Sequence, residues 1–185
     1  MTYARLSYNT NNWGTPSGPY GKSRNIGVHE FIYGFGFEEW LFSQNHFLSD
    51  KNDKKYHYGY LEGINKNYKQ GDENESLVLF TINNNLHQRF IVGEIKIWQK
   101  VDANESLLIV QNNPELIEEM REQVAAVTNN NFIALDKFDL HRHNGNDHQL
   151  FNIKFDKIDF DFKIDNPVNQ DHNIIKFNRF WLYRR

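Results

Sequence analysis

The chain has 185 residues, of which 39% are hydrophobic, 24% are charged and 15% are aromatic, with a formal net charge of −3 at pH 7. This length fits one domain over residues 1–185, and the aromatic content excludes a disordered chain. The absence of cysteine excludes thiol catalysis, cysteine-ligated metal centres and disulfides. No apolar run approaches the roughly 20 residues that span a bilayer, and no secretory signal pattern begins the chain. We therefore expect a cytoplasmic protein without membrane contact.

Strand patterns dominate the sequence. In chain order they cover residues 1–9, 56–61, 77–82, 88–101, 151–155, 158–164 and 174–183. Residues 83–87 have the composition of a hairpin turn between two of these strands. Within residues 88–101 the apolar alternation slips by one position, which predicts a bulge near Gly93.

One clear helix pattern follows the hairpin. Asn113 is the expected cap, Pro114 occupies the first helical position, and the following glutamates favour the positive end of the helix. Its apolar stripe consists of Leu116, Ile117, Met120, Val124 and Val127. A shorter helix is expected from Phe37 to Phe42. Many strands, few helices and no βαβ alternation predict an α+β fold, a small curved β-barrel with two or three flanking helices.

A long polar loop occupies residues 9–23. Its glycines let the backbone approach a ligand, and Ser17, Lys22 and Ser23 are suited to contact phosphate oxygens. The Gly-Lys-Ser sequence at residues 21–23 lacks the spacing of a P-loop, so we exclude nucleotide hydrolysis. The alternative is a surface loop that Trp13 anchors.

An aromatic row follows this loop. In an extended segment, Tyr33, Phe35 and Phe37 would lie on one side, and stacking of a base on one such ring contributes roughly 1–3 kcal/mol. Glu38 and its neighbour Glu39 can accept hydrogen bonds from the exocyclic amine of cytosine. The alternatives are a core strand followed by the first turn of a helix. Tyr58 and Tyr60 share a strand face and can extend the same pocket, and such rings also suit a sugar ligand.

Two segments contain residues of the kinds that bind metal ions. Residues 140–148 are rich in histidine and aspartate, but we interpret them as a polar turn between strands. Glu94 and Lys96, with Asp72 upstream, match half of a PD-(D/E)xK nuclease core. This set supports an alternative function, a metal-dependent nuclease.

Taken together, several segments resemble the N-terminal domains of bacterial HNH and restriction endonucleases, in which a reader domain precedes the nuclease. The segments are Ala4–Asn9, Trp13–Ser23, His29–Phe42, His57–Glu62, Gly93–Ile95, Leu150–Phe155 and Asn178–Tyr183. Their layout is also similar to the PUA-like group (SRA, EVE and YTH domains), small barrels that take a flipped, often modified base into an aromatic pocket. The resemblance implies pocket roles for Trp13, Tyr33, Trp40, Tyr58 and Tyr60, and backbone contacts for Lys22, Ser23, Arg24 and Arg179.

The sequence thus predicts a DNA-binding domain that recognises a modified base, such as modified cytosine, within a restriction or defence system. Its expected partner is double-stranded DNA, and nuclease activity would reside in a separate domain or subunit. We expect no cofactor, no metal and no catalytic residue in this chain. The candidate base-binding residues are Trp13, Tyr33, Phe35, Glu38, Trp40, Tyr58 and Tyr60, and the candidate phosphate-binding residues are Ser17, Lys22, Ser23, Arg24 and Arg179. A carbohydrate-binding module is a further alternative.

Overall fold

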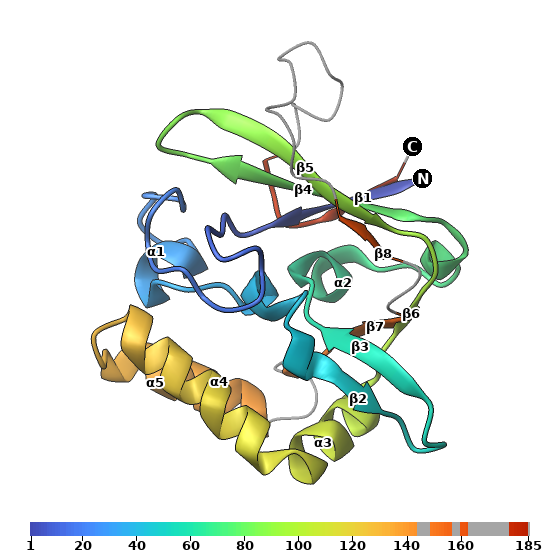
Figure 1. The fold of residues 1–185 in the computed structure, drawn as a ribbon. Coiled ribbons are helices and arrows are strands. Elements are labelled where there is room, and N and C mark those ends of the chain that lie inside the picture. The colour runs from blue at the N-terminus through green and yellow to red at the C-terminus, as the bar shows by residue number, and fades with distance from the viewer. Residues whose placement is uncertain (144–148, 157–159, 163–177, 185) are drawn as a thin grey trace.

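The structure is a computed structural model that describes residues 1–143, 149–156, 160–162 and 178–184. Two β-sheets and a layer of helices make up the molecule, with the larger sheet on the side opposite helices α3, α4 and α5 (Figure 1). The two ends of the chain lie next to each other at one edge of this sheet (Figure 1). The α+β class predicted from the sequence is therefore confirmed.

The larger sheet has five strands in the order β8-β5-β4-β1-β9. These are β8 (Phe160–Phe162), β5 (Gln88–Ile95), β4 (Leu77–Asn83), β1 (Thr2–Leu6) and β9 (Leu182–Arg184). Strands β1 and β4 pair in parallel, and the other neighbours are antiparallel. Every residue of β1 and β4 is buried, as is expected of central strands covered on both faces.

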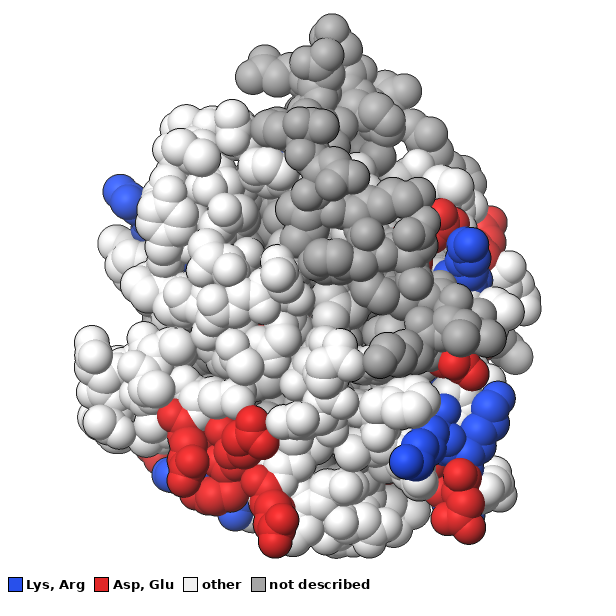
Figure 2. Space-filling model, in the orientation of Figure 1, with Lys and Arg blue, Asp and Glu red and all other residues white. Residues whose placement is uncertain are grey.

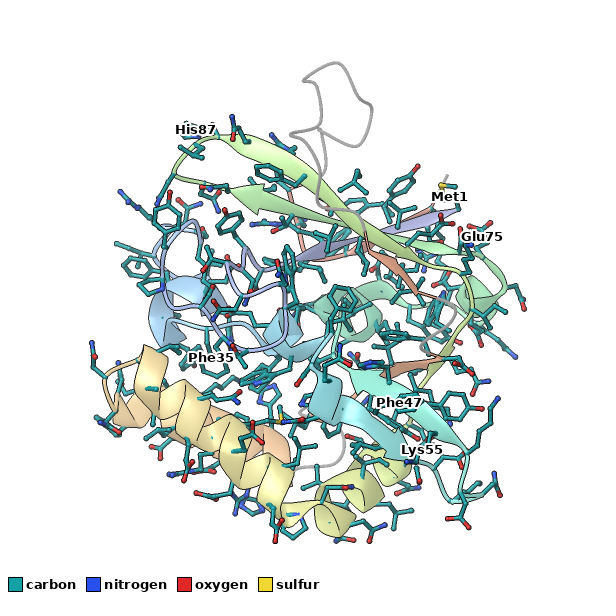
Figure 3. The ribbon with its side chains drawn as sticks, in the orientation of Figure 1. Met1, Phe35, Phe47, Lys55, Glu75 and His87 are labelled. Carbon is teal, nitrogen blue, oxygen red and sulfur yellow. The ribbon has the colours of Figure 1, made fainter. Side chains whose placement is uncertain are left out.

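The hairpin between β4 and β5 matches the prediction from the sequence. Residues 84–87 form the turn, and its tip at His87 is labelled in Figure 3. The pairing register shifts between Leu79, which faces Gly93, and Phe80, which faces Ile91. The additional residue in β5 is thus Val92, and the predicted bulge near Gly93 is confirmed.

The smaller sheet has four strands in the order β2-β3-β7-β6, all antiparallel. They are β2 (Phe47–Ser49), β3 (Lys55–Gly59), β7 (Ile153–Phe155) and β6 (Trp98–Lys100). The chain leaves the larger sheet after Ile95 and enters the smaller sheet at Trp98. The prediction of one strand over residues 88–101 was therefore wrong, because these residues form two strands in different sheets.

Three hydrophobic clusters make up the interior of the described part of the chain. One consists of Tyr3, Val78, Phe80 and Ile82 of the larger sheet, and Tyr58 and Phe155 of the smaller sheet belong to the other two. Tyr58 packs in the cluster that includes Phe138 and other residues of α3, α4 and α5, whereas Phe155 packs in the cluster that includes Leu79 of the larger sheet. Figure 3 shows Phe35 between the N-terminal loop and the helical layer. The smaller sheet therefore contributes side chains to both of these clusters.

The helices are more numerous than the two or three that were predicted. They are α1 (His29–Tyr33), α2 (Glu62–Asn67), α3 (Ala103–Asn112), α4 (Pro114–Val127) and α5 (Phe132–His143), together with the 3₁₀ turns η1 (Phe37–Trp40), η2 (Gln44–His46) and η3 (Asp72–Asn74). None of the helices in the described segments is long and apolar enough to cross a membrane.

Helix α4 has the predicted bounds, and Ile117, Met120 and Val124 of its stripe are buried. The capping prediction was wrong in one respect. The side chain of Asn113 donates to the carbonyl oxygen of Ile109, 2.8 Å away, and so caps the end of α3. Helix α3 begins at its own cap, Asp102, whose carboxylate accepts from the backbone N–H of Glu105 at 2.8 Å.

The predicted barrel is not closed among the described strands, since both sheets end in edge strands. Helix α5 also replaces the first part of the polar turn predicted at residues 140–148, of which residues 144–148 lie outside the described part. The strands predicted at residues 158–164 and 174–183 are described only at 160–162 and 178–183. Of these, residues 160–162 and 182–183 are in strands.

The long N-terminal loop is ordered around one buried carboxylate, that of Glu39. Glu39 is fully buried and forms an ion pair with Lys22 (Nζ to Oε1, 2.7 Å), which is 1% exposed. The same carboxylate accepts from Asn9 Nδ2 at 2.8 Å and from the backbone N–H groups of Ser17 and Gly36 at 2.9 and 2.7 Å. Burial raises the pKa of Glu39, and Lys22 with these donors opposes that shift.

The buried pair yields a stability prediction. Lys22→Met removes the cation and leaves the Glu39 carboxylate without a charge partner, which typically costs about 3–5 kcal/mol. Adding Glu39→Gln to Lys22→Met should recover part of this loss, because the unpaired charge is then gone. Urea unfolding of the two variants measures both effects.

Lys66→Met is the matched control, because Lys66 pairs with Glu62 at 3.1 Å but is more than half exposed. Its loss should be within about 1 kcal/mol. Equal stability of Lys22→Met and the wild type would show that the pair does not hold the loop.

Candidate functional site

A cavity of about 990 Å³ lies where β1, α1, η1, α2 and α5 meet residues 178–181. Its lining includes segments from both ends of the described chain. Among the lining residues are aromatic rings, carboxylates and basic side chains, so the cavity combines an apolar wall with charged groups. Ligand sites commonly have this combination.

Three of the aromatic rings that line the cavity lie in contact with one another. Phe37 stacks on His141 with ring centroids 3.9 Å apart, and Tyr60 lies 5.5 Å from Phe37 and 6.3 Å from His141. The hydroxyl of Tyr60 donates to Glu62 and accepts from Asn65 at 3.1 Å. These bonds fix the tyrosine ring against the cavity, because they hold its polar end.

Glu38 is the most strongly perturbed acid in this wall. Its carboxyl group is 3% exposed, accepts from Ser7 Oγ at 3.1 Å, and lies 3.3 Å from the backbone nitrogen of Glu62. Burial raises the pKa of Glu38 to about 8, and the charge of Glu62 adds to the shift. At neutral pH the group is therefore mostly protonated, and it can donate a hydrogen bond as well as accept one.

Basic side chains also line the cavity. They are Arg5, Lys66, Lys100, Lys137 and Arg179. Arg5 is 8% exposed and its guanidinium lies 4.3 Å from the ring centroid of Phe180, whereas Lys66, Lys100 and Arg179 are exposed. The cavity thus has a buried cation inside and exposed cations around it.

The structure brings only some of the predicted residues to this cavity. Glu38, Tyr60, Ser23 and Arg179 line it, as does Phe37 of the predicted aromatic row. Tyr33 ends α1 instead of lying in a strand, and its ring centroid is 4.5 Å from that of His29. The row of rings on one side of an extended segment was therefore wrong, because the chain is helical on both sides of Gly34–Gly36.

The remaining predicted pocket residues are core residues. They are Trp13, Phe35, Trp40 and Tyr58, each at most 2% exposed. Trp13 donates to the carbonyl of Ser7 at 2.9 Å, Trp40 to Gln123 at 2.7 Å and Tyr58 to Glu105 at 2.8 Å. Their polar atoms are satisfied inside the protein, and their rings do not line the cavity.

The predicted phosphate contacts are separated from one another. Lys22 and Ser17 bind the buried carboxylate of Glu39, which leaves the Lys22 ammonium without access to a phosphate. Arg24 is exposed and lines a second hollow of about 510 Å³, with Tyr20 and Phe31. Ser23 lines both this hollow and the larger cavity.

The structure does not group the nuclease set. Asp72 accepts from Arg184 Nε at 2.6 Å. Glu94 is paired in register with Val78, so both side chains lie on the face of the larger sheet where Tyr183 packs. Arg184 is the next residue of β9 after Tyr183, and successive residues of a strand point to opposite faces. Glu94 and Arg184 therefore lie on opposite faces of this sheet. Within the described residues no group of three histidine, aspartate or glutamate side chains is arranged to hold a metal ion.

Sequence reasoning missed Arg5, His29, Glu30 and Glu62, which line the cavity. A weak signal was present in Arg5, a charged residue in the apolar run of β1. Burial lowers the pKa of His29 to about 4, with the charges of Lys137 and Lys22 adding to the shift. His29 is therefore neutral at pH 7.

The raised pKa of Glu38 predicts a pH dependence of stability. Between pH 4.5 and 8 the unfolded chain releases a proton that folded Glu38 retains, so the folded state loses stability as the pH rises through this window. Glu38→Gln removes this loss while keeping a side chain of the same shape. Relative to the wild type, this variant should gain on the order of 4 kcal/mol in the free energy of unfolding from pH 5 to pH 9.

Denaturant unfolding at pH 5, 7 and 9 measures the difference, with Glu119→Gln on the exposed face of α4 as the control. The control should follow the wild type at every pH. Parallel curves for Glu38→Gln and the wild type would contradict the protonated state of Glu38.

Comparison of this chain with protein-family models, with curated proteins and with solved structures finds no match in any of the three sets. The chemistry of the cavity is therefore the basis for a functional assignment. Its defining features are the rings of Phe37, Tyr60 and His141 beside the buried carboxyl group of Glu38.

Proposed function

We propose that the protein is a non-catalytic domain that binds double-stranded DNA and takes one modified base, such as a modified cytosine, into the cavity. The observation that carries the proposal is the meeting of aromatic faces and a buried, protonated carboxyl group in one cavity. A base needs both, because its faces stack on rings and its edge forms hydrogen bonds.

The energetics suit a flipped base. Extrusion from the duplex costs a few kcal/mol. Stacking on one aromatic ring contributes roughly 1–3 kcal/mol per base, and Phe37, Tyr60 and His141 all border the cavity. Hydrogen bonds to the base edge inside a buried site then decide which base is retained, since an unmatched polar group there is costly.

The charge distribution limits how DNA can approach. Helix α4 carries Glu115, Glu118, Glu119 and Glu122, and acidic side chains gather at the lower left of the view in Figure 2, over the region of this helix. This face repels phosphates. The exposed cations at the cavity, Lys66, Lys100 and Arg179, are suited to contact them instead, with Arg24 at the adjacent hollow.

The finer parts of the proposal come from the sequence resemblance. We propose a relation to the PUA-like readers, a place in a restriction or defence system, and a nuclease in a separate domain or subunit. The alternative of a nuclease at Asp72, Glu94 and Lys96 has no support from the geometry, because Asp72 is bound to Arg184 and the described residues contain no group of acidic and histidine side chains arranged to hold a metal ion. A carbohydrate ligand is an outcome that the following experiment distinguishes.

Fluorescence anisotropy with duplexes that differ in one cytosine modification tests the proposal at two salt concentrations. Tyr60→Leu removes a stacking face and should weaken binding to the preferred duplex about 5- to 150-fold, which corresponds to the loss of roughly 1–3 kcal/mol. Tyr60→Phe keeps the ring and should bind within a few-fold of the wild type. Arg179→Ala should weaken all duplexes about equally, because phosphate contacts carry no base information.

Lys51→Ala, an exposed position outside the cavity lining, is the control and should bind as the wild type does. Thermal melting of each variant confirms folding. Absence of binding to every duplex would overturn the proposal, and retention on a glycan array would then favour the carbohydrate alternative.

A further inference from the structure

Three buried polar atoms on residues that line the cavity have no hydrogen-bond partner in the described part of the chain. They are Arg5 Nε, His29 Nε2 and Glu30 Oε1. Arg5 is 8% exposed and Glu30 is 3% exposed. Leaving a buried polar atom unpaired costs about 1–3 kcal/mol, so three of them at one cavity indicate groups that a ligand satisfies.

One further polar atom of Arg5 and one of Glu30 have protein partners. Arg5 Nη1 donates to the carbonyl of Asn178, and Glu30 Oε2 accepts from the backbone N–H of Ser23 at 3.3 Å. These two bonds hold the side chains of Arg5 and Glu30 in place, while Arg5 Nε and Glu30 Oε1 have no hydrogen-bond partner. Partial fixation of this kind is what a preorganised recognition site requires.

Burial lowers the pKa of Arg5 and the nearby charge of Glu30 opposes this shift, yet Arg5 Nε and Glu30 Oε1 both lack a hydrogen-bond partner. A ligand that bridges them must offer an acceptor to the Arg5 N–H and a donor to the Glu30 oxygen. His29 is neutral and adds one donor or acceptor without charge. The edge of the ligand that contacts Arg5, His29 and Glu30 must therefore carry polar atoms along its whole length.

We propose, resting on the function proposed above, that Arg5 and Glu30 are the specificity-determining pair and select cytosine over thymine. The exocyclic amine of cytosine donates to Glu30 Oε1, and its carbonyl accepts from Arg5. Thymine presents a carbonyl at each end of its edge, so one of them would face the carboxylate.

Single-stranded oligonucleotides with one 5-methylcytosine or one thymine at the same position test this pair. Both bases carry the same methyl group, and neither has to leave a duplex, so the two probes differ only in the hydrogen-bonding edge. The wild type should bind the 5-methylcytosine probe about 5- to 150-fold more tightly, the range for one bidentate base contact. This comparison requires no variant and does not depend on one folding.

Glu30→Gln should lower this ratio at least about 5-fold, because its amide can donate to the thymine carbonyl. Glu119→Gln, on the exposed face of α4, is the control and should keep the wild-type ratio. Failure of the wild type to bind either probe or any duplex would overturn the proposed function itself. Binding of both probes with equal affinity, or an unchanged ratio in a folded Glu30→Gln variant, would overturn the pair while leaving DNA binding in place.

Discussion

The buried ion pair between Lys22 and Glu39 is the constraint on which the N-terminal third of the structure depends. Two charges removed from water are tolerated only when hydrogen bonds satisfy their remaining atoms, and Asn9, Ser17 and Gly36 supply such bonds to Glu39. One carboxylate thereby joins the beginning, middle and end of a segment with little regular structure. This network positions the parts of the cavity wall that β1, α1 and η1 contribute.

The two neighbouring glutamates of η1, Glu38 and Glu39, have different surroundings and therefore different roles. Glu39 points into the loop network and meets a lysine, whereas Glu38 points toward the cavity, where burial and the charge of Glu62 raise its pKa to about 8. The tight turn makes this divergence possible, because adjacent side chains leave it in different directions. Gly36 enables the close approach, since a Cβ at this position would lie 2.1 Å from Ser7 Oγ and 2.9 Å from Glu38 Oε2.

The cavity itself is assembled from segments that are distant in the sequence. Arg5 comes from the first strand, Tyr60 from the residue after β3, His141 from α5 and Arg179 from near the C-terminus. Each of these residues is ordinary in its local sequence. Only their convergence produces a site with stacking faces, a neutral acid and unpaired polar atoms. Such a combination is typical of sites that recognise a small planar ligand.

Local patterns predicted the elements whose signals are contained in a short window. The helix at Pro114–Val127, the β4–β5 hairpin and the bulge at Val92 all follow from periodicity, capping and turn chemistry within about ten residues. Helix α5 was missed because its stripe is weak, with only Ala134, Phe138 and His141 buried. The break between β5 and β6 was missed because apolar alternation continues across it, although the two halves join different sheets.

The sequence by itself determined the α+β class, the strongest elements and the presence of Glu38, Tyr60, Ser23 and Arg179 among the candidate residues. The tertiary structure decided which aromatic and charged side chains are available to a ligand. The sequence offers Trp13 and Lys22 as ligand contacts, with Trp13 as the anchor of a surface loop as the alternative, but the protein buries both, and Ser7 and Glu39 satisfy their polar atoms. Burial and partner choice depend on residues far apart in the chain, so a local pattern cannot contain them.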